Sequence, residues 1–196
     1  MILVGDWAPD KKKVNLDYNN SVLLANLEGP ILPDNHKLKL APKVGPNIYS
    51  TQLPMDNGCF IFTLANNHIM DYSTPGLEIT LDLLGKRDFR YCGAGKNTSE
   101  ARNPLIIKDN GVRIGIIGCC ETQFGVASHL HAGTAELGPW VYRAIDNLQK
   151  EVDSVIVSIH AAVEDSPWPS PYIQELYRSF IDAGAAVVHG HHSHVP

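Results

Sequence analysis

The sequence is poor in cysteine, and its few cysteines are not spaced like a disulfide framework or a structural zinc site. Cys59, Cys92, Cys119 and Cys120 form no C-x-x-C pair. Adjacent residues such as Cys119 and Cys120 are also poorly placed to bridge each other. We therefore expect reduced, mostly buried thiols, as in a cytoplasmic protein.

The sequence also lacks an excess of basic residues. Its 16 Lys and Arg residues are outnumbered by 21 Asp and Glu residues, and the formal net charge is −5. Nucleic acid and anionic membranes both favour a basic surface, so neither is an expected partner. The short basic run from Lys11 to Lys13 predicts a solvated loop.

Long apolar runs are missing as well. No signal-peptide pattern accompanies the apolar residues 2–5, and the apolar runs elsewhere are strand-sized. We expect a cytoplasmic protein without a membrane span, or a surface-associated one if the sequence is a trimmed part of a longer chain. The length of 196 residues and the hydrophobic content of 44% predict one globular domain over residues 1–196.

Short β-branched or apolar runs are present throughout and predict strands. They occupy residues 2–5, 21–27, 59–65, 113–120, 154–160 and 185–190. Most of them lack polar alternation, which indicates strands buried on both faces. An α/β fold follows, with a β-sheet sandwich flanked by helices.

Two helices are predicted between these strands. Thr74-Pro75 is a good N-cap and N1 pair before an apolar face, and Gly85 is a plausible end. The second helix has an i, i+3, i+4, i+7, i+8 apolar stripe from Ile173 to Ile181, with Gly184 suited to the position after its end.

The connections predict a mixed sheet with long loops. Asn110-Gly111, between two apolar runs, is typical of a two-residue β-hairpin, so at least one strand pair is antiparallel. Residues 30–46 and 123–138 show little periodicity and predict loops. His36, His129 and His131 fall in these loops and are expected to be exposed.

Polar side chains suited to metal ions follow five of the predicted strands. The first four of these strands end in the residues Asp6, Glu28, Asn66, Asn67, His68 and His160. The last strand runs into His189, His191, His192 and His194. Because loops at the carboxyl ends of strands form the ligand sites of α/β folds, we expect these side chains to converge.

The types of these residues indicate the chemistry of the site. A lone histidine after a strand is more often structural than a ligand, and a terminal histidine cluster is also typical of a polar tail. Five strand ends carrying carboxylate, amide and imidazole groups favour a metal centre instead. This donor set contains no cysteine and suits Mn²⁺, Fe, Zn²⁺ or Mg²⁺.

Three segments together resemble the CapA family of capsule and poly-γ-glutamate synthesis proteins. They are "NLEGP" at 26–30, "ANNHIMDY" at 65–72 and "GHHSHVP" at 190–196. The likeness extends over most of the chain, including "GAGKNTSEAR" and "GVRIGIIG". It implies the α/β/β/α fold of calcineurin-like metallophosphoesterases and a centre of two divalent metal ions.

The resemblance also implies a role for each residue of the centre. The metal ligands it implies are Asp6, Glu28, Asn67, His160, His192 and His194, with Glu28 bridging the two ions. The last two ligands form a histidine pair, His192 and His194. His191 is the alternative to His192 in this pair, and His192 is preferred. His68 is implied to contact substrate beside the metals, and Asp71 to orient it.

Other residues near the motifs have two interpretations each. Asn26 either braces the loop of Glu28 or forms a local turn, and Glu164 either supports His160 or is solvated. With Asn66 and His191, they are candidates for contacts to the ligands or to substrate.

The sequence departs from the family pattern at several positions. Residue 8 is Ala8 where the superfamily has a histidine ligand, so the Asp6 side of the centre has fewer ligands. Ala161 and Ala162 replace a Trp-Gly pair, and the chain stops at Pro196 where the family continues with further strands.

Three functions are compatible with these patterns. The first is a metal-dependent hydrolase, a phosphoesterase in capsule or surface-polymer metabolism. The second is a metal-dependent amide hydrolase or transferase that acts on a γ-glutamyl polymer. The third is a non-catalytic accessory protein. The partners implied are an anionic polymer or phosphoester and components of a capsule or polymer synthase.

Overall fold

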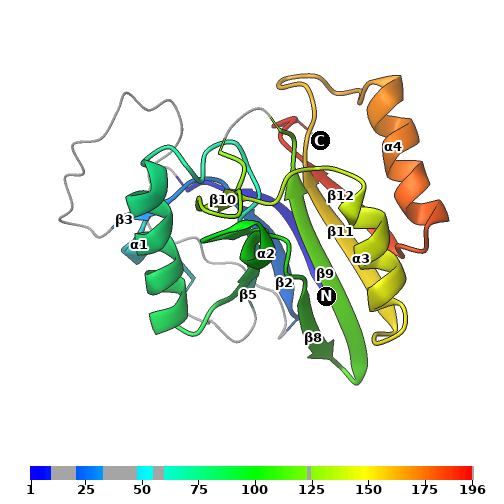
Figure 1. Ribbon diagram of the computed structural model, residues 1–196, viewed down its shortest axis with the longest axis horizontal. Helices are drawn as coiled ribbons and strands as arrows, with labels where there is room; N and C mark the ends of the chain where they lie inside the picture. Colours follow the sequence, from blue (N-terminus) through cyan, green and yellow to red (C-terminus); the bar gives the residue numbers. More distant parts are fainter. Residues whose placement is uncertain (10–20, 33–47, 55–59, 123–124, 196) are drawn as a thin grey trace.

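Two four-stranded sheets lie face to face, and helices cover their outer faces (Figure 1). The computed structural model describes residues 1–9, 21–32, 48–54, 60–122 and 125–195. Lys11 to Lys13, His36 and Cys59, for which the sequence makes predictions, lie outside these ranges. The α/β fold with a mixed sheet sandwich, predicted from the sequence, is confirmed.

The first sheet is entirely parallel. Its strands, in spatial order, are β1 (Ile2–Trp7), β2 (Leu23–Leu27), β5 (Phe60–Thr63) and β6 (Arg90–Cys92). Helix α1 (Ser73–Lys86) covers its outer face. Leu77 and Leu84 of this helix join the buried cluster that also contains Phe60 and Phe62 of β5.

The second sheet contains the predicted antiparallel pair. Its strands, in spatial order, are β12 (Val187–His191), β11 (Ser154–His160), β9 (Val112–Cys120) and β8 (Leu105–Asp109). β8 pairs antiparallel with β9 through a turn at Asn110 and Gly111, which both have positive φ, as such hairpins require. Helices α3 (Trp140–Leu148) and α4 (Pro171–Asp182) cover its outer face.

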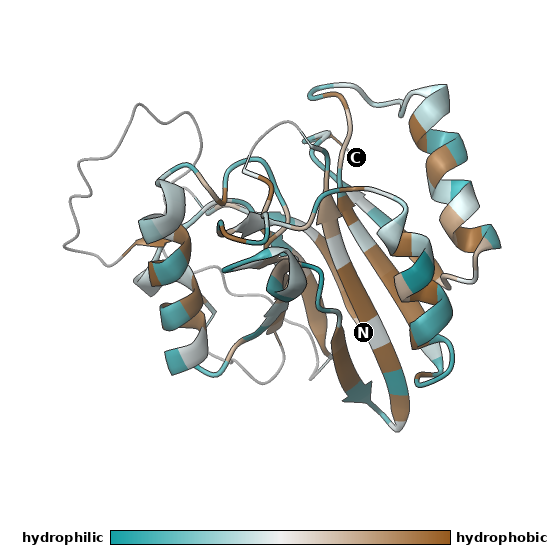
Figure 2. Ribbon diagram, in the orientation of Figure 1, coloured by the Kyte–Doolittle hydropathy of each residue, from teal (hydrophilic) through white to brown (hydrophobic). Residues whose placement is uncertain are grey.

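The central strands β2, β5, β9 and β11 are mostly buried on both faces, as the sequence predicts. Leu24 of β2 and Ile116 of β9 belong to a cluster between the two sheets. Their neighbours in sequence, Leu23 and Ile117, belong instead to the clusters under the helices. The brown colouring of the strands in Figure 2 shows this apolar character. A rigid sandwich of this kind fixes the positions of the loops at its strand ends.

The helix boundaries differ partly from the prediction. α1 begins at Ser73 with Tyr72 as N-cap and no side-chain cap, so the predicted N-cap and N1 pair Thr74-Pro75 was wrong by two residues, and the helix continues through Gly85. α4 is capped by Ser170, and Gly184 follows its end with φ of +108°. The prediction for Gly184 is confirmed, because glycine adopts this conformation without strain.

Several short elements lie where the sequence predicts loops. In the first loop, β3 (Ile31–Leu32) pairs with β4 (Ile48–Tyr49), which leads into the 3-10 helix Ser50–Gln52. In the second, β10 (Gly133–Thr134) pairs with β7 (Ala94–Gly95), which precedes α2 (Thr98–Ala101). Helix α3 was not predicted, although Val141, Ile145 and Leu148 are spaced as one buried helical face.

The side chains outside the strand-end cluster behave as the sequence suggests. Cys92, Cys119 and Cys120 are buried free thiols, and burial raises the pKa of Cys92 to about 12 and that of Cys120 to about 11. They are therefore unreactive. His129 and His131 are exposed. Among the described residues, no helix has the length and apolar character needed to cross a bilayer.

Candidate metal centre

The carboxyl ends of both sheets meet at one edge of the sandwich. In the first sheet Asp6, Asn26 and Thr63 are aligned across three parallel strands. In the second sheet Cys120, His160 and His191 are aligned in the same way. A cavity of about 530 Å³ opens there, lined by Gly5, Asp6, Glu28, Gly190, His191, His192, Ser193, His194 and Val195. The side chains that follow the predicted strands therefore converge at one edge of the sandwich, as expected from their positions at strand ends.

Asn26 links the two sheets at this edge. Its Nδ2 atom donates to Asp6 Oδ1 at 2.7 Å and lies 3.1 Å from His160 Nδ1, on the other sheet. Its Oδ1 atom accepts a hydrogen bond from Asn66 Nδ2 at 3.2 Å. Of the two interpretations of Asn26, bracing of the site fits these contacts, because its polar atoms bond to residues distant in sequence.

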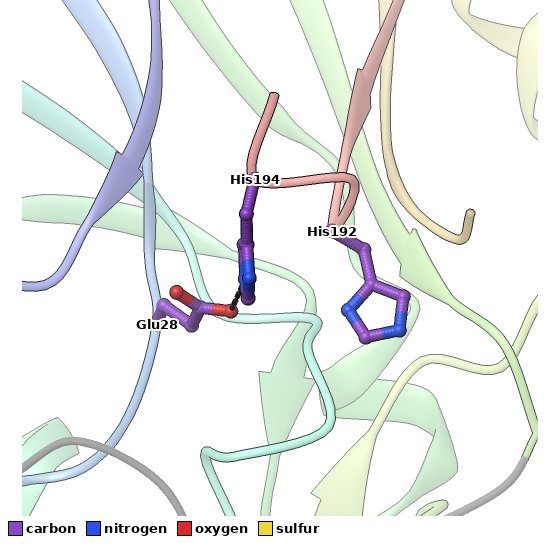
Figure 3. Close-up of side chains that lie close together, drawn as sticks. All are labelled: Glu28, His192 and His194. Atoms are coloured by element: carbon purple, nitrogen blue, oxygen red, sulfur yellow. Dashed lines mark hydrogen bonds and ion pairs between the residues drawn. The ribbon is translucent and has the colours of Figure 1, made fainter. Parts of the chain in front are cut away.

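Two groups of donor atoms share one carboxylate. Glu28, His192 and His194 form one group, and Asp6, Glu28 and His160 form the other; within each group the donor atoms lie within 4.8 Å of one another. His194 Nε2 is 3.1 Å from Glu28 Oε1, as the dashed line in Figure 3 marks. Glu28 is therefore positioned between the groups, which is the place of a bridging ligand.

Asn67 and His68 lie at the same edge, on the loop after β5. Asn67 Oδ1 is 2.9 Å from His160 Nε2, and Asn67 Nδ2 is 3.4 Å from His68 Nε2. His68 Nδ1 is 3.1 Å from Asp71 Oδ2, which is the contact expected of an orienting carboxylate. Asn66 Oδ1 holds this loop by accepting from the backbone N–H groups of His68 and Ile69 at 3.1 and 2.8 Å.

His191 and His192 occupy different environments. His191 Nε2 contacts Ser158 Oγ at 3.1 Å, and its Nδ1 lies 3.2 Å from Asp6 Oδ1. His192 belongs to a donor group, and its backbone has φ of +88°, which is rare for a residue with a side chain. Such strain is typical of functional sites. The arrangement favours His192 over His191 as the ligand.

Glu121 is a member of the site that the sequence prediction missed. It directly follows β9, and its Oε1 atom lies 3.5 Å from His192 Nε2. Figure 3 shows one ring nitrogen of His192 turned toward Glu28 and His194, and the other turned away. The strand-end rule applied to "GCCE" at 118–121 was sufficient to find this residue.

Glu164 and His189 lie at the margin of the centre. Glu164 is 53% exposed, and its Oε1 atom lies 3.9 Å from Nδ1 of His192. Of its two interpretations, a largely solvated side chain agrees with this exposure. His189 stacks edge-on against His191, with ring centroids 4.2 Å apart.

Burial and neighbouring charges shift the pKa values of the site. Burial favours a higher pKa for Asp6, but hydrogen bonds with His191 and Asn26 outweigh it and hold the pKa well below its usual range. Burial and the charge of Asp6 raise the pKa of Glu28. Burial lowers the pKa of His160 to about 3. His160 is therefore neutral near pH 7, the state in which an imidazole binds a metal.

We expect the metal-free protein to lose stability as the pH falls from 8 to 5. His160 binds protons below about pH 6.5 when unfolded but only below about 3 when folded, so the unfolded state gains protons over this window. At pH 5 the difference for His160 is about 2 kcal/mol. Urea unfolding of chelator-treated protein at both pH values measures it. The free energy of unfolding should depend less on pH in His160→Asn, and should keep its pH dependence in His131→Asn, which changes an exposed histidine. An equal pH dependence in both variants would contradict the assignment to His160.

The donor set fits divalent metal ions. The Nδ1 atom of His192 is buried and has no hydrogen-bond partner among the residues described. A buried nitrogen without a partner is costly, and a ligated ion would compensate it. Carboxylate, amide and imidazole donors without thiolate match Mn²⁺, Fe, Zn²⁺ or Mg²⁺.

Two sheets between helix layers, with such donors at the strand ends, are consistent with the metallophosphoesterase-like class of α/β folds. The family model described as "Bacterial capsule synthesis protein PGA_cap" matches residues 12–196. The chain belongs to this family, which confirms the CapA resemblance.

Two of the relatives that the chain matches are named CapA. The chain is 29% identical over 190 residues to the capsule biosynthesis protein CapA of Bacillus anthracis, covering 90% of this chain and 46% of that protein. It is 31% identical over 153 residues to the PGA biosynthesis protein CapA of Bacillus subtilis, covering 76% and 40%. A probable polyglutamine synthesis accessory protein of Mycobacterium tuberculosis is 30% identical over 152 residues, covering 69% and 40%. The chain thus spans less than half the length of these relatives.

Proposed function

We propose that the protein is a metal-dependent hydrolase, with phosphoric esters as its substrates. The observation that carries this proposal is the position of Glu28, whose carboxylate belongs to both groups of donor atoms. A carboxylate shared by two groups is what a pair of divalent ions requires. We assign Asp6, Glu28, Asn67, His160, His192 and His194 as the ligands.

The charges of the centre support a role for cations. Asp6 and Glu28 are close enough that the charge of one raises the pKa of the other, and no Lys or Arg lines the described cavity. An anionic phosphoester would be repelled by these carboxylates alone. Bound divalent ions would supply Lewis-acid activation of a phosphoryl group and of an attacking water.

His68 is assigned the proton transfer to the leaving oxygen. Its Nε2 atom lies beside Asn67, and Asp71 contacts its Nδ1 atom. A carboxylate at Nδ1 fixes the orientation of the ring and stabilises its protonated form. In this assignment Asp71 is a positioning residue, and His68 is the general acid.

The names of the relatives support a biological setting for the proposed activity. The relatives are named for capsule and PGA biosynthesis, and we infer the same setting for this protein. One relative is named an accessory protein, which favours a non-catalytic polymer-binding role as the second candidate. Hydrolysis of a γ-glutamyl amide is an alternative reaction for the proposed hydrolase, because the same centre would activate water for attack on an amide.

A turnover assay separates these candidates. The purified chain is given Mn²⁺ and tested with bis(p-nitrophenyl) phosphate, p-nitrophenyl phosphate and poly-γ-glutamate. Release of nitrophenolate that rises with Mn²⁺ and disappears with chelator supports the phosphoesterase. Cleavage of poly-γ-glutamate alone supports the amide hydrolase. Polymer binding without cleavage of any substrate would overturn the hydrolase and favour the accessory protein.

We predict that Glu121 strengthens metal binding through His192. The carboxylate of Glu121 would accept the proton on Nε2 of His192, which leaves Nδ1 of His192 unprotonated and able to bind a metal ion. Removing such a carboxylate costs roughly 10–100-fold in metal affinity. Competition of Zn²⁺ between the protein and a chelating dye measures this effect in Glu121→Ala. Glu121→Gln should lose less, because its amide oxygen still accepts a hydrogen bond.

The matched control for this experiment is Glu151→Gln, which changes an exposed carboxylate away from the centre. Its Zn²⁺ affinity should equal that of the unaltered protein. An unchanged affinity in Glu121→Ala would show that Glu121 does not act through His192.

A further inference from the structure

A second cavity opens beside the metal centre, next to helices α3 and α4. Its volume is about 380 Å³, at the lower end of the range of small-molecule sites, which is roughly 300–1,000 Å³. Leu137, Pro139, Tyr142, Tyr172, Leu176 and Phe180 line it. Tyr142 and Phe180 pack with ring centroids 4.8 Å apart, so the two helices contribute one aromatic wall.

This cavity adjoins the centre through two residues. Glu121 lines the cavity, and its carboxylate lies 3.5 Å from Nε2 of His192. Ala161 also lines it and directly follows His160. A molecule whose reacting group is held at the centre can therefore extend one of its other groups into the cavity.

The charges of the cavity limit what that group can be. Glu121 is the one charged side chain among the lining residues described, and none of them is Lys, Arg or His. Inside the cavity, an acidic group would meet the charge of Glu121, and no cationic lining residue is present to compensate it. The cavity is thus unsuited to a free carboxylate of a glutamyl polymer and suited to apolar or aromatic atoms.

We propose that this cavity is a subsite for an uncharged, apolar or aromatic group of the substrate, carried next to the bond that is hydrolysed. The proposal rests on the proposed hydrolase function and names its substrate class. Tyr172 is 70% exposed at the cavity and would be covered by such a group.

Binding of an uncharged fluorescent probe tests the cavity without turnover or metal. N-phenyl-1-naphthylamine should bind the full chain saturably, and Tyr142→Ala and Tyr172→Ala should each weaken it about tenfold, the scale of one aromatic contact. Tyr172 is largely exposed, so its replacement does not threaten the fold. Leu130→Ala, at an 87% exposed residue outside the cavity, is the control and should bind normally. Absent binding, or equal binding by all variants, overturns the proposal.

A pair of esters tests the connection to catalysis. p-Nitrophenyl phenylphosphonate and p-nitrophenyl methylphosphonate share the leaving group and the charge, and differ in the group that is retained. We expect kcat/KM to be at least about tenfold higher for the phenyl ester, and Tyr172→Ala to remove the preference. Equal values overturn the subsite but leave the hydrolase. If neither ester is hydrolysed while the probe still binds, the hydrolase is overturned and the cavity is the apolar site of a binding protein.

Discussion

Replacing Glu28 with alanine should remove both metal ions and lower kcat for a phosphoester by roughly a thousandfold or more. The reason is its position: the two donor groups have this one carboxylate in common. Asp6, His160, His192 and His194 each belong to one group, so the loss of any one of them should weaken one ion more than the other. Elemental analysis of the purified variant, together with turnover of bis(p-nitrophenyl) phosphate, measures both effects.

Loss of metal and activity in Glu28→Ala should not result from unfolding of the variant. Burial and the charge of Asp6 raise the pKa of Glu28, so the ionised carboxylate of Glu28 does not favour folding of the metal-free protein. The metal-free Glu28→Ala protein should therefore unfold at nearly the same urea concentration as the unaltered protein. A variant that keeps two ions would show that Glu28 does not bridge them.

Replacing His68 with alanine should lower kcat by roughly 10²–10⁴ and leave the metal content nearly intact. His68 lies outside both donor groups, and its contacts are Asn67 and Asp71. Asp71→Asn should have a smaller effect of the same kind, because it changes the orientation and charge of the ring and keeps the imidazole. Both variants are compared in elemental analysis and in turnover across pH.

Two results bear directly on the role of His68. The general acid appears as the basic limb of the pH profile, and this limb should disappear in His68→Ala. Loss of metal from that variant would instead make His68 a ligand, and the division between ligands and proton donor would have to be redrawn.

Much of the fold was predictable because the central strands β2, β5, β9 and β11 are mostly buried on both faces. Runs such as "SVIVSIH" at 154–160 have no polar alternation, and the residue that ends this strand, His160, reaches the centre as expected. Likewise, Asn110-Gly111 predicted the hairpin because both residues accept positive φ. These signals are local, and the structure follows them.

The rest of the fold depends on contacts that no local pattern specifies. α3 begins after Pro139 without a side-chain N-cap, so no capping signal marked it. β3 and β10 have two residues each and are defined by pairing with distant segments. A two-residue strand has no periodicity from which it can be predicted.

The centre shows the same division. Its donor residues were found because each ends a strand, and the position of Glu28 between two groups agrees with the role that the resemblance implies. Sequence spacing left Glu164 either beside His160 or solvated, and in the structure it is 53% exposed and lies 3.9 Å from His192. The apolar cavity was not predicted, because α3 and α4 come together there from separate parts of the chain.

Anomalous X-ray diffraction from crystals equilibrated with Mn²⁺ tests the central claim most directly, because it locates each bound ion without reference to activity. The account predicts two peaks, about 3.5–4 Å apart, with the carboxylate of Glu28 between them. One peak should lie within ligand distance of His192 or His194, and the other within ligand distance of Asp6, Asn67 or His160. A single peak away from Glu28, or no peak at this edge of the sandwich, would contradict the two-metal centre.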